Sequence, residues 1–258
     1  MNVFKILKYN LYKILLKILP KTTLKYLGQL KILKPIRDFL FGRDNQSFFR
    51  DYINWNEEKF YFYASPQVLY KAKKRGIESS LLRAIIKIID NNSNIIDIGA
   101  NYGFLTIVLA KYVLERNGKI FSFEYDKNIF DFLKKSIDKN NLTNVELFNF
   151  FMGEENFNNI KTVNSLLSKS DVSVDLIKID TDGSDLECLK GCSEIILKYH
   201  PIIVIESNDN LEFIVNYVKK YGYNYYYNQY LVEYQEKNLN NEEVPNLIAS
   251  IKKINFRD

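Results

Sequence analysis

Short apolar runs alternate with longer amphipathic segments from about residue 79 onward. The apolar runs predict strands at 94–98, 119–124, 144–150, 174–180 and 201–206. Helical spacing of apolar positions predicts helices at 79–90, 103–115, 127–139, 162–169, from Gly183 to Tyr199, and at 209–221. Two further strands are predicted at 223–228 and 246–254, joined by a polar loop. Such alternation favours an α/β fold with a mostly parallel, seven-stranded sheet covered by helices on both faces.

The N-terminal residues follow a different pattern. Apolar side chains at helical spacing from Val3 to Leu19 leave lysines largely on the other side, and Pro20 ends the predicted helix. Short helices are expected over 21–42, and an aromatic stretch at 43–76 is expected either to form core or to cap the active-site mouth. The predicted organisation is a helical basic extension, residues 1–76, followed by a catalytic domain, residues 77–258.

Positive charge is concentrated in that extension. Residues 1–43 carry ten Lys or Arg and one acid, a net +9, whereas the whole chain carries +5. Lysines interrupt every apolar run, so residues 1–20 predict neither a signal peptide nor a bilayer span. Two alternatives remain: the apolar stripe packs on protein, or the helix lies on an anionic membrane surface. The mildly acidic remainder disfavours a nucleic-acid partner.

Two cysteines, Cys188 and Cys192, are too few for a zinc site or a disulfide framework. This usage fits a reducing compartment and predicts a cytoplasmic protein, with peripheral attachment to the inner membrane surface if residues 1–20 bind lipid. No sequence pattern favours a particular oligomeric state.

The segment from Asp97 to Gly103 predicts a cofactor loop. An apolar strand ends in Asp97, and Gly99, Ala100, Asn101, Tyr102 and Gly103 lead into a helix. This is the arrangement that binds nucleotide-like cofactors at the carboxyl end of a parallel sheet. Asp97 is expected to point to where a pyrophosphate would lie, and a carboxylate there repels phosphate. The cofactor expected is therefore the cationic S-adenosylmethionine.

Glu124 supports that prediction. It ends the second predicted strand, 21 residues after Gly103. An acid about 20 residues beyond the glycine turn is placed to accept hydrogen bonds from ribose hydroxyls.

The stretch Leu176-Ile-Lys178-Ile-Asp180-Thr-Asp182-Gly183-Ser-Asp185, continuing to Gly191, resembles the I-K-x-D-x-E-G-x-E-x-x-x-L-x-G pattern of the FkbM methyltransferases. The resemblance covers roughly residues 77 to 254. It implies a class I methyltransferase Rossmann-like fold and O-methylation of sugar, glycan or related small-molecule hydroxyls. Glu78 resembles the acid of that family upstream of the first strand, and Tyr125 takes the place of its proline. Asp182 and Asp185 stand where the family has glutamates.

Methyl transfer to a hydroxyl needs an aligned nucleophile and a group that accepts its proton. The candidate residues for that role follow the fourth and fifth strands: Asp180, Asp182, Asp185 and Glu206. Four carboxylates around one mouth would raise one another's pKa, so that one acts as a base, or two would hold a divalent metal.

The function expected from these observations is S-adenosylmethionine-dependent O-methylation of a sugar or glycan acceptor. Two alternatives remain open: N-methylation of protein or nucleic acid, and a non-catalytic, membrane-docked module with the same fold. The usual base-methylating signatures are absent, and the intact cofactor loop with Glu124 argues against the module.

Overall fold

The computed structural model describes residues 49–75, 79–167, 172–181, 183–206, 211–235 and 245–256, together with Ile14. The helices predicted over residues 1–42, apart from Ile14, lie outside the described residues, as do the candidate site residues Glu78 and Asp182. The chain divides into two compact units, Met1–Ile77 and Glu78–Asp258. None of the described helices is long and apolar enough to cross a bilayer.

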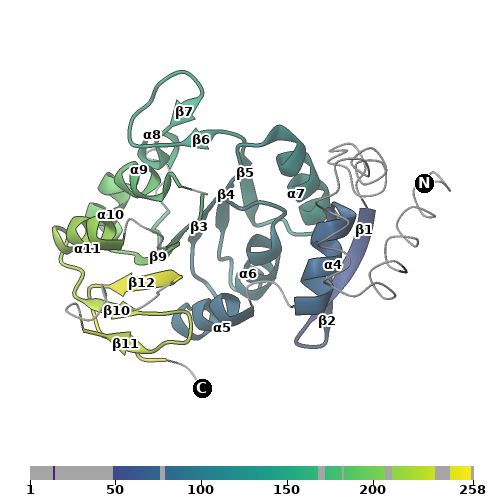
Figure 1. Ribbon diagram of the computed structural model, residues 1–258, viewed down its shortest axis with the longest axis horizontal. Helices are drawn as coiled ribbons and strands as arrows, with labels where there is room; N and C mark the ends of the chain where they lie inside the picture. Colours follow the sequence, from purple (N-terminus) through teal and green to yellow (C-terminus); the bar gives the residue numbers. More distant parts are fainter. Residues whose placement is uncertain are drawn as a thin grey trace, which may run out of the picture. The chain divides into compact units, whose positions relative to one another are not determined.

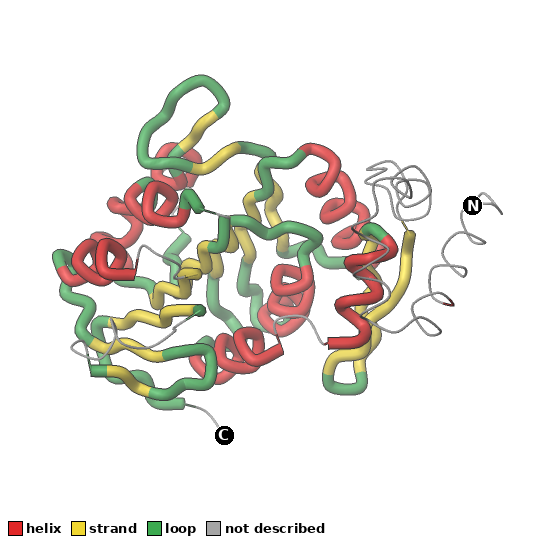
Figure 2. Tube along the Cα trace, viewed as in Figure 1, coloured by secondary structure: helices red, strands yellow, loops and turns green. Residues whose placement is uncertain are grey.

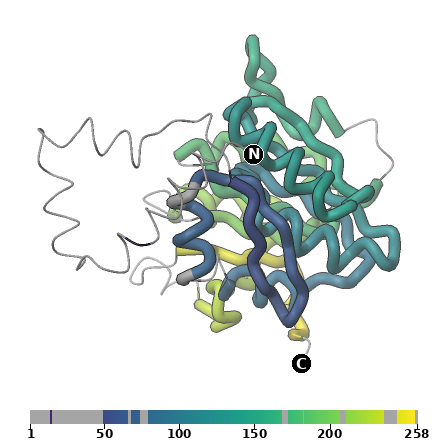
Figure 3. Tube along the Cα trace, turned by 90° about the vertical axis from the view of Figure 1, so that its right-hand side faces the viewer, coloured from purple at the N-terminus to yellow at the C-terminus, as the bar shows by residue number. Residues whose placement is uncertain are grey.

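The described part of the first unit is a β-hairpin followed by a helix. Strand β1 (Phe49–Trp55) pairs antiparallel with β2 (Glu58–Ala64), and α4 (Pro66–Arg75) packs on both strands (Figure 3). Asn56 and Glu57 join the strands with φ angles of 45° and 69°, as a tight two-residue hairpin turn requires. Phe60 and Phe62 are buried, which agrees with the core alternative for these two aromatics.

The second unit is built on an eight-stranded sheet with the order β11-β10-β12-β9-β8-β3-β4-β5 (Figure 1). The five parallel strands are β3 (Ile95–Ile98), β4 (Ile120–Phe123), β5 (Val145–Phe148), β8 (Leu176–Ile179) and β9 (Ile202–Glu206). Strand β12 (Asn246–Ser250) lies antiparallel between β9 and β10 (Tyr225–Tyr227). The α/β architecture and its mostly parallel sheet are confirmed. A short edge strand, β11 (Glu233–Tyr234), makes the sheet one strand wider than predicted.

Helices cover both faces of this sheet (Figure 2). They are α5 (Ser79–Ile88), α6 (Phe104–Leu114), α7 (Lys127–Lys139), α8 (Val163–Leu167), α9 (Asp185–Lys190), α10 (Ser193–Tyr199) and α11 (Leu211–Lys219). The small parallel pair β6 (Phe151–Met152) and β7 (Ile160–Lys161) projects beyond the sheet (Figure 1).

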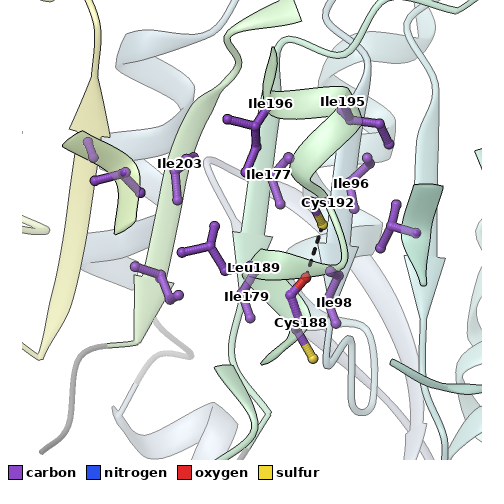
Figure 4. Packing of buried hydrophobic residues seen from close by; sticks show 14 of the residues in the cluster. Ile96, Ile98, Ile177, Ile179, Cys188, Leu189, Cys192, Ile195, Ile196 and Ile203 are labelled. Atoms are coloured by element: carbon purple, nitrogen blue, oxygen red, sulfur yellow. Dashed lines mark hydrogen bonds between the residues drawn. The ribbon is translucent and has the colours of Figure 1, made fainter. Parts of the chain in front are cut away.

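A hydrophobic cluster lies under α8 to α11. Apolar residues of β3, β8 and β9, such as Ile96, Ile177 and Ile203, pack there with both cysteines, which are fully buried (Figure 4). Burial raises the pKa of the Cys188 thiol to about 12. The cysteines are therefore core residues, and neither thiol is ionised near neutral pH.

The single helix predicted from Gly183 to Tyr199 is wrong, because the chain forms α9 and α10 instead. The break falls at Gly191, whose carbonyl accepts a hydrogen bond from the Asn164 N–H at 3.1 Å and does not continue the helix. A β-carbon on Gly191 would lie 2.1 Å from the Gly153 carbonyl oxygen. Close backbone contacts of this kind leave no periodic signal in the sequence.

Candidate active site

The loop after β3 bends through left-handed backbone conformations. The φ angles of Gly99, Asn101 and Gly103 are 76°, 54° and 82°, a region that glycine and asparagine tolerate best. Gly99 and Ala100 both donate their N–H groups to the Phe123 carbonyl at 3.0 Å. The loop is thereby tied to the end of β4 before α6 begins.

Glu124, directly after β4, completes that connection. Its Oε2 accepts a hydrogen bond from the Asn101 N–H at 2.9 Å, and its Oε1 accepts one from the Asp126 N–H at 2.8 Å. The residue is only 7% exposed, and burial raises the pKa of its carboxyl above the ordinary value. Each carboxylate oxygen retains a second lone pair that could accept a ligand hydroxyl.

A cavity of about 210 Å³ opens at the carboxyl ends of β8, β3, β4 and β5. Four segments line it: Ile98, Gly99 and Asn101; Glu124, Tyr125, Asp126 and Ile129; Phe150, Phe151 and Met152; and Asp180, Thr181 and Ser184. This is the edge at which open α/β sheets bind ligands. The charged lining residues are all acidic: Glu124, Asp126 and Asp180.

Asp97 does not point into this cavity, contrary to the orientation expected from the sequence. It is 1% exposed, and its Oδ2 accepts a hydrogen bond from the Thr106 hydroxyl at 2.5 Å. The Lys178 ammonium lies 3.2 Å from Oδ1. That contact is an ion pair outside hydrogen-bond geometry, since Oδ1 has no hydrogen-bond partner among the described residues. Lys178 is the residue beside Asp97 in the parallel pairing of β3 with β8, so the lysine and α6 hold the carboxylate inside.

The other loop residues shape the turn. Tyr102 stacks on Phe132 of α7, with ring centroids 6.1 Å apart. Gly103 donates its N–H to the Ala100 carbonyl at 2.9 Å, and a β-carbon on Gly103 would lie 2.2 Å from Leu133. Ala100, Tyr102 and Gly103 are absent from the cavity lining given above, whereas Gly99, Asn101, Glu124 and Tyr125 belong to it.

The candidate catalytic carboxylates separate into different environments. Asp180 follows β8 and lines the cavity, and 32% of its side chain is exposed. Asp185 is 3% exposed, and its Oδ1 accepts hydrogen bonds from the Thr181 N–H at 2.8 Å and the Thr181 hydroxyl at 3.0 Å. Asp185 therefore holds the turn after β8. Glu206 ends β9 opposite Asn246 of β12 and is not a lining residue.

Among the described residues, the four predicted carboxylates do not gather around one cavity. Asp180 lines the cavity together with two other carboxylates, Glu124 and Asp126. In the same part of the chain, no group of three or more His, Cys, Asp or Glu side chains is arranged to hold a metal ion.

Sequence reasoning missed several residues of the site. Phe150, Phe151 and Ile129 line the cavity, and Lys178 lies beneath it. Lys178 could have been found, because it is a charged residue inside the otherwise apolar run of β8. The other three carry no sequence signal of their own.

Two methyltransferase families match segments of this chain. Residues 158–225 match the methyltransferase FkbM domain, and residues 71–158 match protein-L-isoaspartate(D-aspartate) O-methyltransferase. No match was found among curated proteins.

Solved structures share the fold. The T. thermophilus 16S rRNA N2 G1207 methyltransferase, crystallised with AdoMet (S-adenosylmethionine) and guanosine, is 16% identical with a TM-score of 0.51; the match covers 80% of this chain and 51% of that protein. A methyltransferase FkbM from Methylobacillus flagellatus is 17% identical with a TM-score of 0.49, over 63% of this chain. The matched region spans only 44% of the M. flagellatus protein.

These observations converge on one class of enzyme. The α/β fold with its mostly parallel sheet is that of class I methyltransferases, and two methyltransferase families match neighbouring segments of the chain. We therefore identify the chain as an S-adenosylmethionine-dependent methyltransferase in which residues 158–225 are similar to the FkbM methyltransferase domain.

Proposed function

We propose that the enzyme transfers the methyl group of S-adenosylmethionine to a hydroxyl of a sugar, glycan or related small molecule. The observation that carries the proposal is a cavity lined both by the predicted cofactor loop with Glu124 and by Asp180. Cofactor and acceptor groups would therefore meet in one cavity, and alignment of reactants supplies much of the rate of such a displacement.

The cavity lining fits the cofactor. The Glu124 carboxylate would accept hydrogen bonds from the ribose hydroxyls, and the turn at Gly99 and Asn101 would hold the amino-acid portion. Because its charged lining residues are all acidic, the cavity favours a cationic sulfonium and disfavours the phosphates of a dinucleotide. S-adenosylmethionine supplies the electrophilic methyl group when bound.

Asp180 is the residue proposed to act on the acceptor. Its carboxylate is exposed to the cavity and would accept a hydrogen bond from an acceptor hydroxyl, orient it and take its proton as the bond to carbon forms. The nearby Ser184 hydroxyl donates to Thr181 Oγ1 at 3.0 Å, so it can still accept a hydrogen bond from a second hydroxyl.

Aromatic side chains support a sugar acceptor. Tyr125 and Phe151 line the cavity, are 65% and 38% exposed, and meet edge to face with ring centroids 5.5 Å apart. Exposed rings beside hydroxyl and carboxylate groups suit a ligand with an apolar face and several hydroxyls. The acidic lining argues against a carboxylate acceptor such as an isoaspartyl residue, and against nucleic-acid phosphates.

The proposal is tested with a panel of acceptors. Full-length enzyme and S-adenosylmethionine would be incubated with sugar nucleotides, free glycans, transfer RNA and isoaspartyl peptides, and products examined by mass spectrometry for one added methyl group. Methylation of a sugar hydroxyl is expected. Methylation confined to RNA or peptide would contradict the acceptor class. Failure to bind S-adenosylmethionine in calorimetry would contradict the site itself.

A further inference from the structure

A lysine is buried directly beneath the cavity. Lys178 belongs to β8, all four residues of which are buried, and its side chain is 5% exposed. Burying a charge costs free energy even when it is paired, and an apolar pair of similar volume is often as stable as a buried ion pair. Stability alone therefore does not account for a lysine at this position.

The Lys178 ammonium reaches both halves of the proposed site. It donates a hydrogen bond to the Gly99 carbonyl at 3.1 Å, in the turn of the cofactor loop. It also lies 3.2 Å from Asp97 Oδ1 and 3.8 Å from Asp180 Oδ2. One cation is thus shared by the loop after β3 and the carboxylate after β8.

The two loops also meet directly at this point. Asp180 donates its N–H to the Ile98 carbonyl at 3.1 Å. A β-carbon on Gly99 would lie only 1.7 Å from the Asp180 carbonyl oxygen, so the two backbones are in contact with no room between them. A displacement of either loop would be passed to the other.

We propose that Lys178 is a positioning residue that holds the Gly99 turn of the cofactor loop in register with Asp180. It is not a cavity-lining residue and acts only through those two neighbours. The inference rests on the proposed S-adenosylmethionine site, because Gly99 lines the cofactor side of the cavity.

The test compares Asp97→Asn with the double variant Asp97→Asn/Lys178→Met. Both proteins carry Asp97→Asn and therefore lack the buried carboxylate. Loss of the ammonium in Lys178→Met then leaves no unpaired negative charge at position 97. Asp97→Asn still holds the lysine contacts with Gly99 and Asp180, which the double variant lacks. Calorimetry of full-length protein with S-adenosylmethionine and with S-adenosylhomocysteine is the first readout, and amide hydrogen exchange without ligand is the second.

We expect the double variant to bind both ligands at least about tenfold more weakly than Asp97→Asn, because a charge-assisted hydrogen bond to the loop is lost. Exchange should accelerate in peptides covering 99–103, while α10 remains protected as in Asp97→Asn. If the double variant does not melt cooperatively, Asp97→Leu/Lys178→Met, an apolar pair, replaces it.

Equal affinities and equal exchange in the two variants would overturn the inference. A loss of affinity for only one of the two ligands would also overturn the inference. Positioning of the loop affects the affinity for both ligands equally, whereas an electrostatic effect would differ between the sulfonium of S-adenosylmethionine and the neutral thioether of S-adenosylhomocysteine. If the parent protein binds neither ligand, the proposed cofactor site is wrong, which is a result distinct from failure of the Lys178 role.

Discussion

The Asn101 backbone N–H donates a hydrogen bond to the Glu124 carboxylate at 2.9 Å, and this contact joins the loops that follow β3 and β4. Asn101 reaches that position in a left-handed conformation with φ of 54°. A ligand hydroxyl that binds Glu124 would therefore bind a carboxylate that the predicted cofactor loop already holds in place. The Glu124 side chain then loses less conformational entropy when the ligand binds.

Glu124→Gln should weaken S-adenosylmethionine binding at least about tenfold, because charge-assisted hydrogen bonds become neutral ones. Isothermal calorimetry measures the change. The control is Glu146→Gln, the same chemical change on an exposed residue of the adjacent strand β5, which should bind like the parent. Parental affinity in Glu124→Gln would exclude Glu124 as the ribose acceptor.

Glu124 should also make stability depend on pH in a defined direction. Burial raises the pKa of its carboxyl above the ordinary value of 4.5, so the folded state holds the proton more tightly than the unfolded state. The stabilising contribution is full below the unfolded pKa and is lost as pH rises through the folded pKa. The free energy of unfolding of the parent and of Glu124→Gln would be measured in urea across this pH range. As pH rises, the parent should lose stability relative to Glu124→Gln. A gain in the relative stability of the parent would contradict the raised pKa.

Gly99→Ala should destabilise the protein by at least about 3 kcal/mol, since strain from positive φ adds to an overlap with the Asp180 carbonyl. Gly222→Ala is the matched control: its φ is 87°, but a β-carbon there would meet nothing within 4 Å. The control should lose only about 1–2 kcal/mol, the cost of the backbone conformation. Equal losses in urea unfolding would show that the contact with Asp180 does not matter.

Asp180→Asn should lower turnover about a hundredfold on an acceptor found in the screen, because the amide cannot take a proton. Its affinity for S-adenosylmethionine should stay within a few-fold of the parent. Asp131→Asn, at an exposed surface ion pair on α7, controls for the loss of one carboxylate and should retain turnover. Near-parental turnover in Asp180→Asn would give that residue a structural role.

The charge pattern of residues 1–20 leads to a prediction about a segment of which the structure describes only Ile14. If the basic amphipathic helix binds lipid, full-length protein should sediment with anionic liposomes and much less with neutral ones, and added salt should release it. Deletion of residues 1–20 should abolish sedimentation and leave cofactor binding intact. If the parent ignores liposomes and the deletion changes solubility or oligomer size, the apolar stripe packs on protein.

Local signals predicted the parts of the molecule that depend on near neighbours. Helix α7 begins and ends as its amphipathic spacing predicts, at Lys127 and Lys139, with Asp126 accepting hydrogen bonds from Asn128 and Ile129 as its N-cap. The tight turn between β3 and α6 was predictable because glycine and asparagine are needed where φ is positive. The position of Glu124 directly after β4 was predictable because a short apolar run predicts the strand that it follows.

Contacts between distant residues were not predictable in the same way. The inward orientation of Asp97 depends on Lys178, 81 positions further along the chain and adjacent only through strand pairing. The β1–β2 hairpin was missed because β2 carries aromatic residues on both faces, so the usual alternation of apolar and polar positions is absent.

The place of β12 in the sheet has a consequence for how the protein is made. The ribosome delivers β10 and β11 before residues 246–250, yet β12 lies between β9 and β10. Until residues 246–250 join the sheet, one edge of β9 is unpaired, and the β10–β11 pair has no strand through which to join the sheet. Leu247, Ile248 and Ala249 become completely buried once in place. An unpaired strand edge is prone to aggregation, so truncation of the chain before residue 246 should lower the yield of soluble protein.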